Sequence, residues 1–202
     1  MEDVQKWSHF LLPYKFALDE LKTKINIMAE EAKYLNDYNP IEHIKTRIKS
    51  PESIMAKLER KNIVPSLLSS KSHLFDIAGM RIVCSFVNDI YDIYDQLINR
   101  KDIKIMEVKD YIKSPKPNGY QSLHLIVQIP VTLSHGIENV YAEIQLRTLA
   151  MDFWASLEHK IYYKYDKRIP NYLEKDLLEA SQTAKLMDEK MMSIHDEVKN
   201  LH

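Results

Sequence analysis

The chain has 202 residues, of which 45% are hydrophobic, so it is long enough to bury one good core. Lysine and arginine together number 28 against 29 aspartates and glutamates, which excludes the global positive charge that drives nonspecific nucleic-acid binding. No apolar run reaches the roughly 18 residues of a membrane span, and the N-terminus lacks a signal-peptide core, so we expect a cytoplasmic protein. The single cysteine, Cys84, excludes an internal disulfide and is interpreted as a buried thiol.

The chain before residue 40 is predicted to form an amphipathic helix. Pro13 is placed near the helix start. Apolar residues then follow at spacings of three and four: Leu18, Leu21, Ile25 and Met28. Pro40 ends this helix, because a proline disfavours the helical conformation of the residue before it.

A second helical segment is expected to carry Ile41 and Ile44 toward Arg47. A further helix is predicted over about 51–62. Ser50 has the side chain of an N-cap, and the proline that follows it suits the first helical position.

The middle of the chain is predicted to form a β-sheet. Strands are expected near 80–87, 103–109, 122–131 and 139–147, with a helix at roughly 89–100. A helix from about 149 to 164 and a break at Pro170 follow. We therefore expect one domain over 1–202, with N-terminal helices at about 5–62, a mixed-sheet core at about 63–165 and a C-terminal helical extension at about 171–200.

Polar side chains alternate with apolar ones in the last predicted strand. The polar set is Tyr141, Glu143, Gln145 and Arg147, and the apolar set is Val140, Ala142, Ile144 and Leu146. Strict period-two alternation predicts a strand whose apolar set packs on a core. A carboxylate, an amide and a guanidinium then project side by side, although a half-exposed edge strand explains the same pattern.

Two of the three glycines open predicted strands beside charged or aromatic residues. Gly79 follows Asp76 and precedes Arg81, and Gly119 precedes Tyr120. Glycine used this sparingly marks a turn or a close backbone approach. Ordinary loop-to-strand turns are the alternative.

A basic cluster surrounds the start of the helix predicted after Ser50. Lys57 and Arg60 share one helical face with Ser53, while Arg47 and Lys49 alternate along the segment that leads into the helix. Cations and a helix N-terminus thus converge on one place, which suits a polyphosphate. A solvated helix face accounts for the same charges.

Together these segments resemble the synthetase domain of the RelA/SpoT family, and the short chain is similar to its small alarmone synthetases. The resemblance covers about residues 35–165 and rests on four motifs: RIKSPESIMAKLER at 47–60, DIAGMR at 76–81, KPNGYQSLH at 116–124 and EIQLRTLAMDFW at 143–154. It implies an α/β fold, a mixed sheet flanked by helices, related in layout to nucleotidyltransferases. It also implies transfer of pyrophosphate from ATP to the 3′ hydroxyl of GDP or GTP, giving (p)ppGpp and AMP.

The resemblance assigns ATP to the basic cluster. In the family, the positions that match this cluster bind the ATP phosphates. The family arginines that match Arg47 and Arg81 sandwich the adenine, a role that a guanidinium can fill and an ammonium cannot. The implied ATP-binding residues are Arg47, Lys49, Ser53, Lys57, Arg60 and Arg81.

Asp76 and Glu143 are the expected catalytic carboxylates and Mg²⁺ ligands. Mg²⁺ needs only one or two protein carboxylates when phosphates and water complete its shell, and Asp76 fits as the principal ligand. By resemblance, Glu143 stands next to the attacking ribose hydroxyl as base or second metal contact. The alternatives are a turn residue for Asp76 and a surface strand carboxylate for Glu143.

The acceptor nucleotide is assigned mainly by resemblance. The implied GDP- and GTP-binding residues are Lys113, Lys116, Tyr120, His124, Gln145, Arg147 and Asp152. The family stacks guanine where Tyr120 stands, although a packed loop aromatic is as common, and Asp152 would accept hydrogen bonds from guanine N1 and N2. Many small members have arginine where this chain has Gln121, which leaves the phosphate contact of that arginine open.

The C-terminal segment carries a regular apolar stripe. Its members alternate spacings of four and three: Leu173, Leu177, Ala180, Ala184, Met187, Met191, Ile194 and Val198. Such a heptad stripe needs a partner, either the N-terminal helix of the same chain or further copies. The family resemblance favours a homotetramer.

Two other functions fit parts of the pattern. One is a nucleotidyltransferase that moves a nucleoside monophosphate, and the other is a non-catalytic RNA-binding module that uses Tyr120 and the lysines. The balanced charge and the paired carboxylates argue against RNA, so we expect an enzyme that requires neither nucleic acid nor a membrane.

Overall fold

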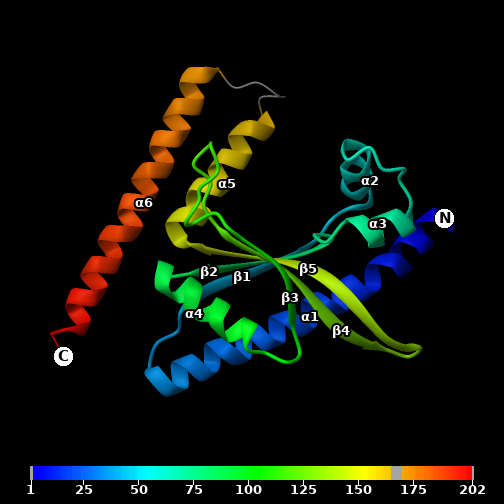
Figure 1. Ribbon diagram of the computed structural model, residues 1–202, viewed down its shortest axis with the longest axis horizontal. Helices are drawn as coiled ribbons and strands as arrows, with labels where there is room; N and C mark the ends of the chain where they lie inside the picture. The colour runs from blue at the N-terminus through cyan, green and yellow to red at the C-terminus, as the bar shows by residue number, and fades with distance from the viewer. Residues whose placement is uncertain (1, 165–169, 202) are drawn as a thin grey trace.

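The fold is built on a curved five-stranded sheet, and the computed structural model describes residues 2–164 and 170–201 of the chain (Figure 1). The strand order is β1-β2-β5-β4-β3. The strands are β1 (Ile41–Ile48), β2 (Ala78–Cys84), β3 (Lys104–Asp110), β4 (Leu123–Leu133) and β5 (Gly136–Thr148). β2 and β5 are parallel and the other neighbours are antiparallel, which confirms the predicted mixed sheet.

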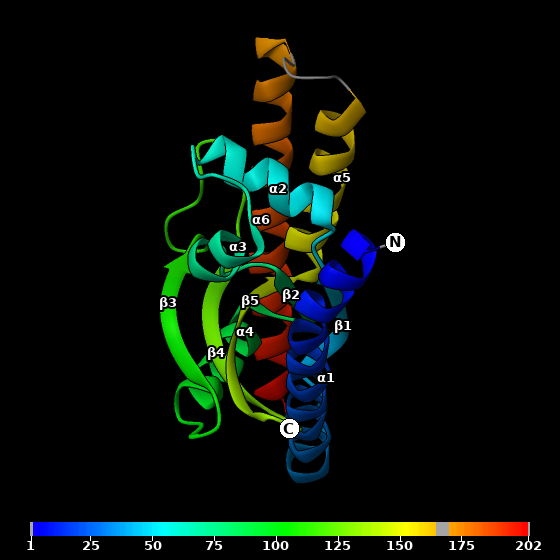
Figure 2. The same ribbon diagram turned by 90° about the vertical axis from the view of Figure 1, so that its right-hand side faces the viewer.

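Helices cover the apolar face of the sheet and extend beyond its ends (Figures 1 and 2). They are α1 (Glu2–Asn36), α2 (Pro51–Arg60), α3 (Leu67–His73), α4 (Val87–Ile98), α5 (Leu149–Lys164) and α6 (Asn171–Lys199). α1 runs along the sheet, and α6 packs beside α5 at the end of the chain. The predicted end of the sheet core, at residue 165, lies outside the described residues. In the described ranges, every helix is too short or too polar to cross a membrane.

The core lies between α1, α4 and the apolar face of the sheet. The apolar set of β5 is buried as predicted, with Ala142, Ile144 and Leu146 fully enclosed. Leu21 and Ile25 of α1 are also fully enclosed. Burial of each large aliphatic side chain contributes about 1.5–3 kcal/mol, so α1 is an integral part of the core.

The start of α1 differs from the prediction. Pro13 lies inside the helix, which already begins at Glu2. Tyr14 and Ala17, just after it, are buried against the core. Tertiary packing therefore outweighs the local cost of the proline, as it commonly does in long helices.

The segment Ile41–Ile48 is a strand, and the prediction of a helix there was wrong. The spacing of Ile41 and Ile44 fits a helix, but β1 pairs along β2 with Arg47 opposite Gly79. This long-range pairing decides the conformation. The region 5–62 is therefore two helices separated by a strand.

The predicted cap of the next helix is confirmed. The Ser50 side chain accepts a hydrogen bond from the backbone N–H of Ser53, and Pro51 opens α2. α3 was not predicted. It is seven residues long, and Ser66 and Ser69 form a reciprocal capping box at its start.

Candidate active site

The polar face of the sheet brings residues from all five strands into neighbouring rows. Strand register places five side chains in one row across the sheet: Lys45, Arg81, Gln145, His124 and Lys109. The next row contains Arg47, Gly79 and Glu143. Directly paired residues point to the same face, so the sheet itself brings together residues that are far apart in the sequence.

A cavity of about 250 Å³ lies over the β1, β2 and β5 part of this face. It is lined by Lys45, Thr46, Arg47, Gly79, Met80, Arg81, Glu143 and Gln145. Arg47 and Arg81, the pair predicted to hold adenine, therefore line one cavity. Lys45 was missed, although it continues the period-two series of Arg47 and Lys49 that a strand assignment would have revealed.

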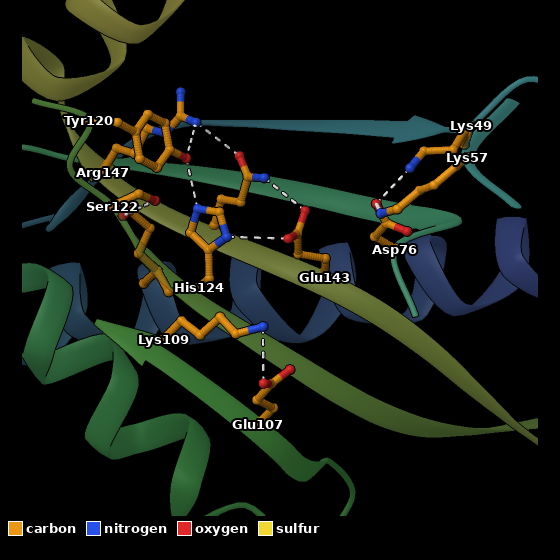
Figure 3. A network of polar contacts seen from close by, with 12 residues as sticks. Lys49, Lys57, Asp76, Glu107, Lys109, Tyr120, Ser122, His124, Glu143 and Arg147 are labelled. Carbon is orange, nitrogen blue, oxygen red and sulfur yellow. Dashed lines mark hydrogen bonds and ion pairs between the residues drawn. The ribbon is translucent and has the colours of Figure 1, made fainter. Parts of the chain in front are cut away.

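Two lysines of the basic cluster meet at Asp76, just before β2. Lys49 Nζ and Lys57 Nζ lie 2.6 and 2.5 Å from Asp76 Oδ2 (Figure 3). Burial opposes ionisation of Asp76, but hydrogen bonds and positive charge from the two lysines hold its pKa below the ordinary value. Asp76 is therefore an anion at neutral pH, and its buried Oδ1 has no hydrogen-bond partner in the described chain.

The other two members of the basic cluster lie on α2. The Ser53 side chain is exposed and accepts a hydrogen bond from Ser50 Oγ. The Arg60 side chain is exposed and donates to the Ala56 carbonyl within its own helix. The structure thus brings Lys49 and Lys57 to Asp76, while Arg60 does not contact that carboxylate.

A hydrogen-bonded network joins Glu143 to Tyr120 (Figure 3). His124 Nδ1 lies 3.2 Å from Glu143 Oε1, and His124 Nε2 lies 2.7 Å from the Tyr120 hydroxyl. Arg147 donates to that hydroxyl at 2.6 Å. Because this hydroxyl accepts from Arg147, it can donate its own hydrogen to His124 Nε2. The other ring nitrogen, Nδ1, then carries a hydrogen and donates to Glu143.

Glu143 is kept ionised by its partners. Burial by itself raises the pKa of this carboxyl. The hydrogen bond from His124, with a hydrogen bond of 2.8 Å from Gln145, outweighs burial and holds the pKa below its ordinary value. At neutral pH the group is a carboxylate, the form that can accept a proton.

Asp152, at the start of α5, connects the cavity to this network. Its Oδ1 lies 3.0 Å from Arg81 Nη1 and 3.2 Å from Arg147 Nη1. One guanidinium lines the cavity and the other contacts Tyr120. Asp152 therefore fixes two arginines relative to each other, and its predicted contact with guanine stays a prediction.

The loop before β4 places its two predicted lysines differently. Lys116 Nζ lies over the rings of Tyr111 and Tyr120, at 4.7 and 4.8 Å from their centroids. Lys113 is largely exposed and lies against Tyr91 and Asp110, at the β3 edge. The structure thus brings Lys116, and not Lys113, to Tyr120.

Tyr111 and Gln121 also lie in this loop. Tyr111 was missed. Its ring makes edge contacts with Tyr120 and His124, but its position outside any motif gave no signal. Gln121, at the position where the resemblance led us to expect arginine, is buried.

Comparison with known protein families finds one family model whose matched region contains all four motifs. The model described as "Region found in RelA / SpoT proteins" matches residues 46–168. The chain belongs to this family. GTP pyrophosphokinase YwaC of Bacillus subtilis is 53% identical over 198 residues, covering 98% of this chain and 93% of YwaC.

Solved structures of family members share the whole fold. The crystal structure of small alarmone synthetase 2 from Bacillus subtilis has a TM-score of 0.87 at 53% identity, covering 95% of this chain and 98% of that one. Small alarmone synthetase 1 of the same organism, bound to its product pppGpp, has a TM-score of 0.89 at 42% identity, covering 96% and 98%. The N- and C-terminal helices are therefore part of the shared architecture.

Proposed function

We propose that the protein is a GTP pyrophosphokinase that transfers pyrophosphate from ATP to the 3′ hydroxyl of GDP or GTP. One observation carries this assignment. Glu143 lines the cavity between Arg47 and Arg81 and, at the same time, joins the network that holds Tyr120. An ionised carboxylate therefore stands where a donor nucleotide and an acceptor nucleotide would meet. The full-length similarity to GTP pyrophosphokinase YwaC supports the same reaction.

The proposed chemistry is an in-line displacement at phosphorus. The acceptor 3′ oxygen forms a bond to the ATP β-phosphorus, the bond from that phosphorus to the bridging oxygen of the α-phosphate breaks, and AMP leaves. Glu143 takes the hydroxyl proton. Arg47 and Arg81 hold the adenine, and Lys49 and Lys57 face the phosphates. Positioning and charge neutralisation supply most of the rate enhancement in such reactions.

Mg²⁺ is the cofactor we propose, held by Asp76 and Glu143. The unpartnered, buried Oδ1 of Asp76 fits a cation ligand, and the two carboxylates are near enough for the charge of Asp76 to raise the pKa of Glu143. Two protein carboxylates suffice for Mg²⁺ when phosphates and water complete its shell. When bound, the ion would neutralise charge on the donor phosphates.

Product analysis tests the proposed function. Purified protein is incubated with ATP and Mg²⁺ and with GDP or GTP in separate reactions, and the nucleotides are separated by anion exchange. We expect AMP together with a guanine nucleotide that carries two more phosphates. Release of free pyrophosphate without AMP would instead indicate transfer of a nucleoside monophosphate.

The acceptor assignment predicts the behaviour of a Tyr120 variant. Tyr120→Ala is expected to raise the KM for GDP severalfold to about a hundredfold, because stacking of a base on an aromatic ring is worth roughly 1–3 kcal/mol. The KM for ATP should stay near the wild-type value. Tyr120→Phe is the matched control, since it keeps the ring and removes only the hydroxyl. If Tyr120→Ala raised the KM values for GDP and ATP equally, Tyr120 would support the loop and would not stack on guanine.

We also propose that the protein is cytoplasmic and forms a homo-oligomer. The family resemblance favours a tetramer. The sequence left open whether α1 covers the α6 stripe, but α1 packs on the sheet and buries its own apolar residues there. A groove of about 1060 Å³ lies between α5 and α6. Exposed apolar residues along it include Phe153, Met187 and Met191. Soluble monomers rarely expose a continuous apolar surface of this kind.

The oligomer predicts the effect of charge in this groove. The double substitution of Met187→Glu and Met191→Glu should dissociate the assembly while the sheet stays folded, because it places two carboxylates in an apolar contact. Light scattering measures the mass, and circular dichroism checks the fold. Leu186→Glu, which adds a charge at an exposed apolar position beside the stripe, is the control. A wild-type monomer across micromolar concentrations would contradict the proposal.

A further inference from the structure

The loop that carries Tyr120 is packed against α6 without space for a side chain. Gly119 is buried and has φ +86°, a conformation that favours glycine. A Cβ at this position would lie 1.9 Å from Ser181 Oγ and 2.6 Å from Ser181 Cβ. It would also lie 3.1 Å from Leu178 Cδ1. The backbone of the loop and one small residue of α6 are therefore matched to each other.

Ser181 contacts Gly119 through close packing and not through a hydrogen bond. The side chain is buried, and its hydroxyl donates to the Leu178 carbonyl at 2.7 Å, within α6 itself. Its hydrogen-bonding requirement is thus met inside the helix, and the hydroxyl is not needed to bind the loop. What the loop requires at this position is a small residue.

The loop is also tied to itself and to α5. The Gly119 amide donates to the Lys116 carbonyl at 2.8 Å, and the Lys116 amide donates to the Tyr120 carbonyl at 3.1 Å. Asn118 Nδ2 donates to Glu158 Oε1 of α5 at 3.1 Å. A loop closed in this way transmits a displacement of Gly119 directly to Tyr120, the next residue.

α6 itself is fixed to the end of the sheet. Thr148, the last residue of β5, donates to Asp188 Oδ2 at 2.6 Å, and Trp154 Nε1 donates to the Leu177 carbonyl at 2.9 Å. These bonds lie on either side of Ser181 along α6. The position of Ser181 is therefore defined relative to β5, which carries Glu143 and Arg147.

We infer that Ser181 is a positioning residue for the acceptor nucleotide. Its small side chain lets the loop close on α6, and the closed loop holds the Tyr120 ring beside His124 and Arg147. Ser181 acts through Gly119 and touches neither substrate. The inference rests on the proposed role of Tyr120 in binding GDP or GTP, and it extends that site to a helix that the motifs do not include.

The first test enlarges the side chain of α6. Ser181→Leu should push Gly119 away and raise the KM for GDP by about tenfold or more, because a displaced Tyr120 ring no longer stacks on the base. The KM for ATP should change by less than about twofold. Ser181→Ala keeps a small side chain and should behave as wild type, and so should Gln182→Leu, the same enlargement at the exposed neighbouring position.

The second test approaches the contact from the loop. Gly119→Ala should raise the KM for GDP, and the double variant Gly119→Ala with Ser181→Gly should recover part of the loss, because it removes the two Ser181 atoms nearest to the new methyl group. Gly136→Ala controls for a side chain at positive φ. Gly136 has φ +134° at the β4–β5 turn, with open space around the added atom.

The outcomes separate this inference from the acceptor assignment. It is contradicted if Tyr120→Ala raises the KM for GDP but Ser181→Leu and Gly119→Ala do not, or if either raises both KM values equally. If Tyr120→Ala itself leaves the KM for GDP unchanged, the role of Tyr120 fails first. Should Ser181→Leu not fold, the Gly119 pair decides: absence of recovery in the double variant would overturn the inference.

Discussion

Glu143→Gln is expected to lower kcat by about two orders of magnitude or more while the fold stays intact. The substitution keeps the size of the side chain but removes the negative charge that accepts a proton, and its single amide oxygen can accept from only one of Gln145 and His124. General-base catalysis and preorganised charge are each typically worth about 10² to 10⁴ in rate. kcat at saturating ATP and GDP measures the effect.

A matched control lies on the same strand. Glu138 of β5 is ion-paired with Lys71 and lies 3.0 Å from His135 Nε2, at the opposite end of the strand from the network. Glu138→Gln should leave kcat within about twofold of wild type. Near-normal turnover in Glu143→Gln, or equal losses in the two variants, would contradict a catalytic role for Glu143.

Asp76→Asn is expected to lower kcat by about a hundredfold or more. The substitution removes the charge that faces Lys49 and Lys57, and it replaces the carboxylate that we propose as a Mg²⁺ ligand with a neutral amide. Asp102→Asn is a suitable control, because Asp102 also accepts two cationic partners, Arg100 and Lys24, but lies outside the site. An Asp76→Asn enzyme with wild-type kcat would rule out this carboxylate as a catalytic group.

Local patterns predicted the features that depend on residues close together in the sequence. The alternation along β5 identified both its buried face and the polar face that carries Glu143 and Gln145. The Ser50 cap was likewise readable, because a cap depends on residues three positions apart. The family motifs pointed to Asp76, which Lys49 and Lys57 contact, while the role of Tyr120 in binding the acceptor stays a prediction.

Long-range pairing explains what the sequence did not predict. Ile41 and Ile44 suit a helical spacing, and only hydrogen bonds to β2 make this segment a strand. Lys45 was missed as a consequence. The contact between Gly119 and Ser181 joins segments far apart in the chain, and neither residue belongs to a periodic pattern that points to the other. Such packing depends on how α6 docks, which no local pattern encodes.

The fate of the ATP phosphates tests the central claim most directly. ATP radiolabelled at the β-phosphate is incubated with the protein, Mg²⁺ and GDP, and a parallel reaction uses ATP labelled at the α-phosphate. Pyrophosphate transfer predicts that the β-label moves to the guanine nucleotide while the α-label stays in AMP. A β-label recovered as free pyrophosphate, with the α-label on the guanine nucleotide, would contradict the account.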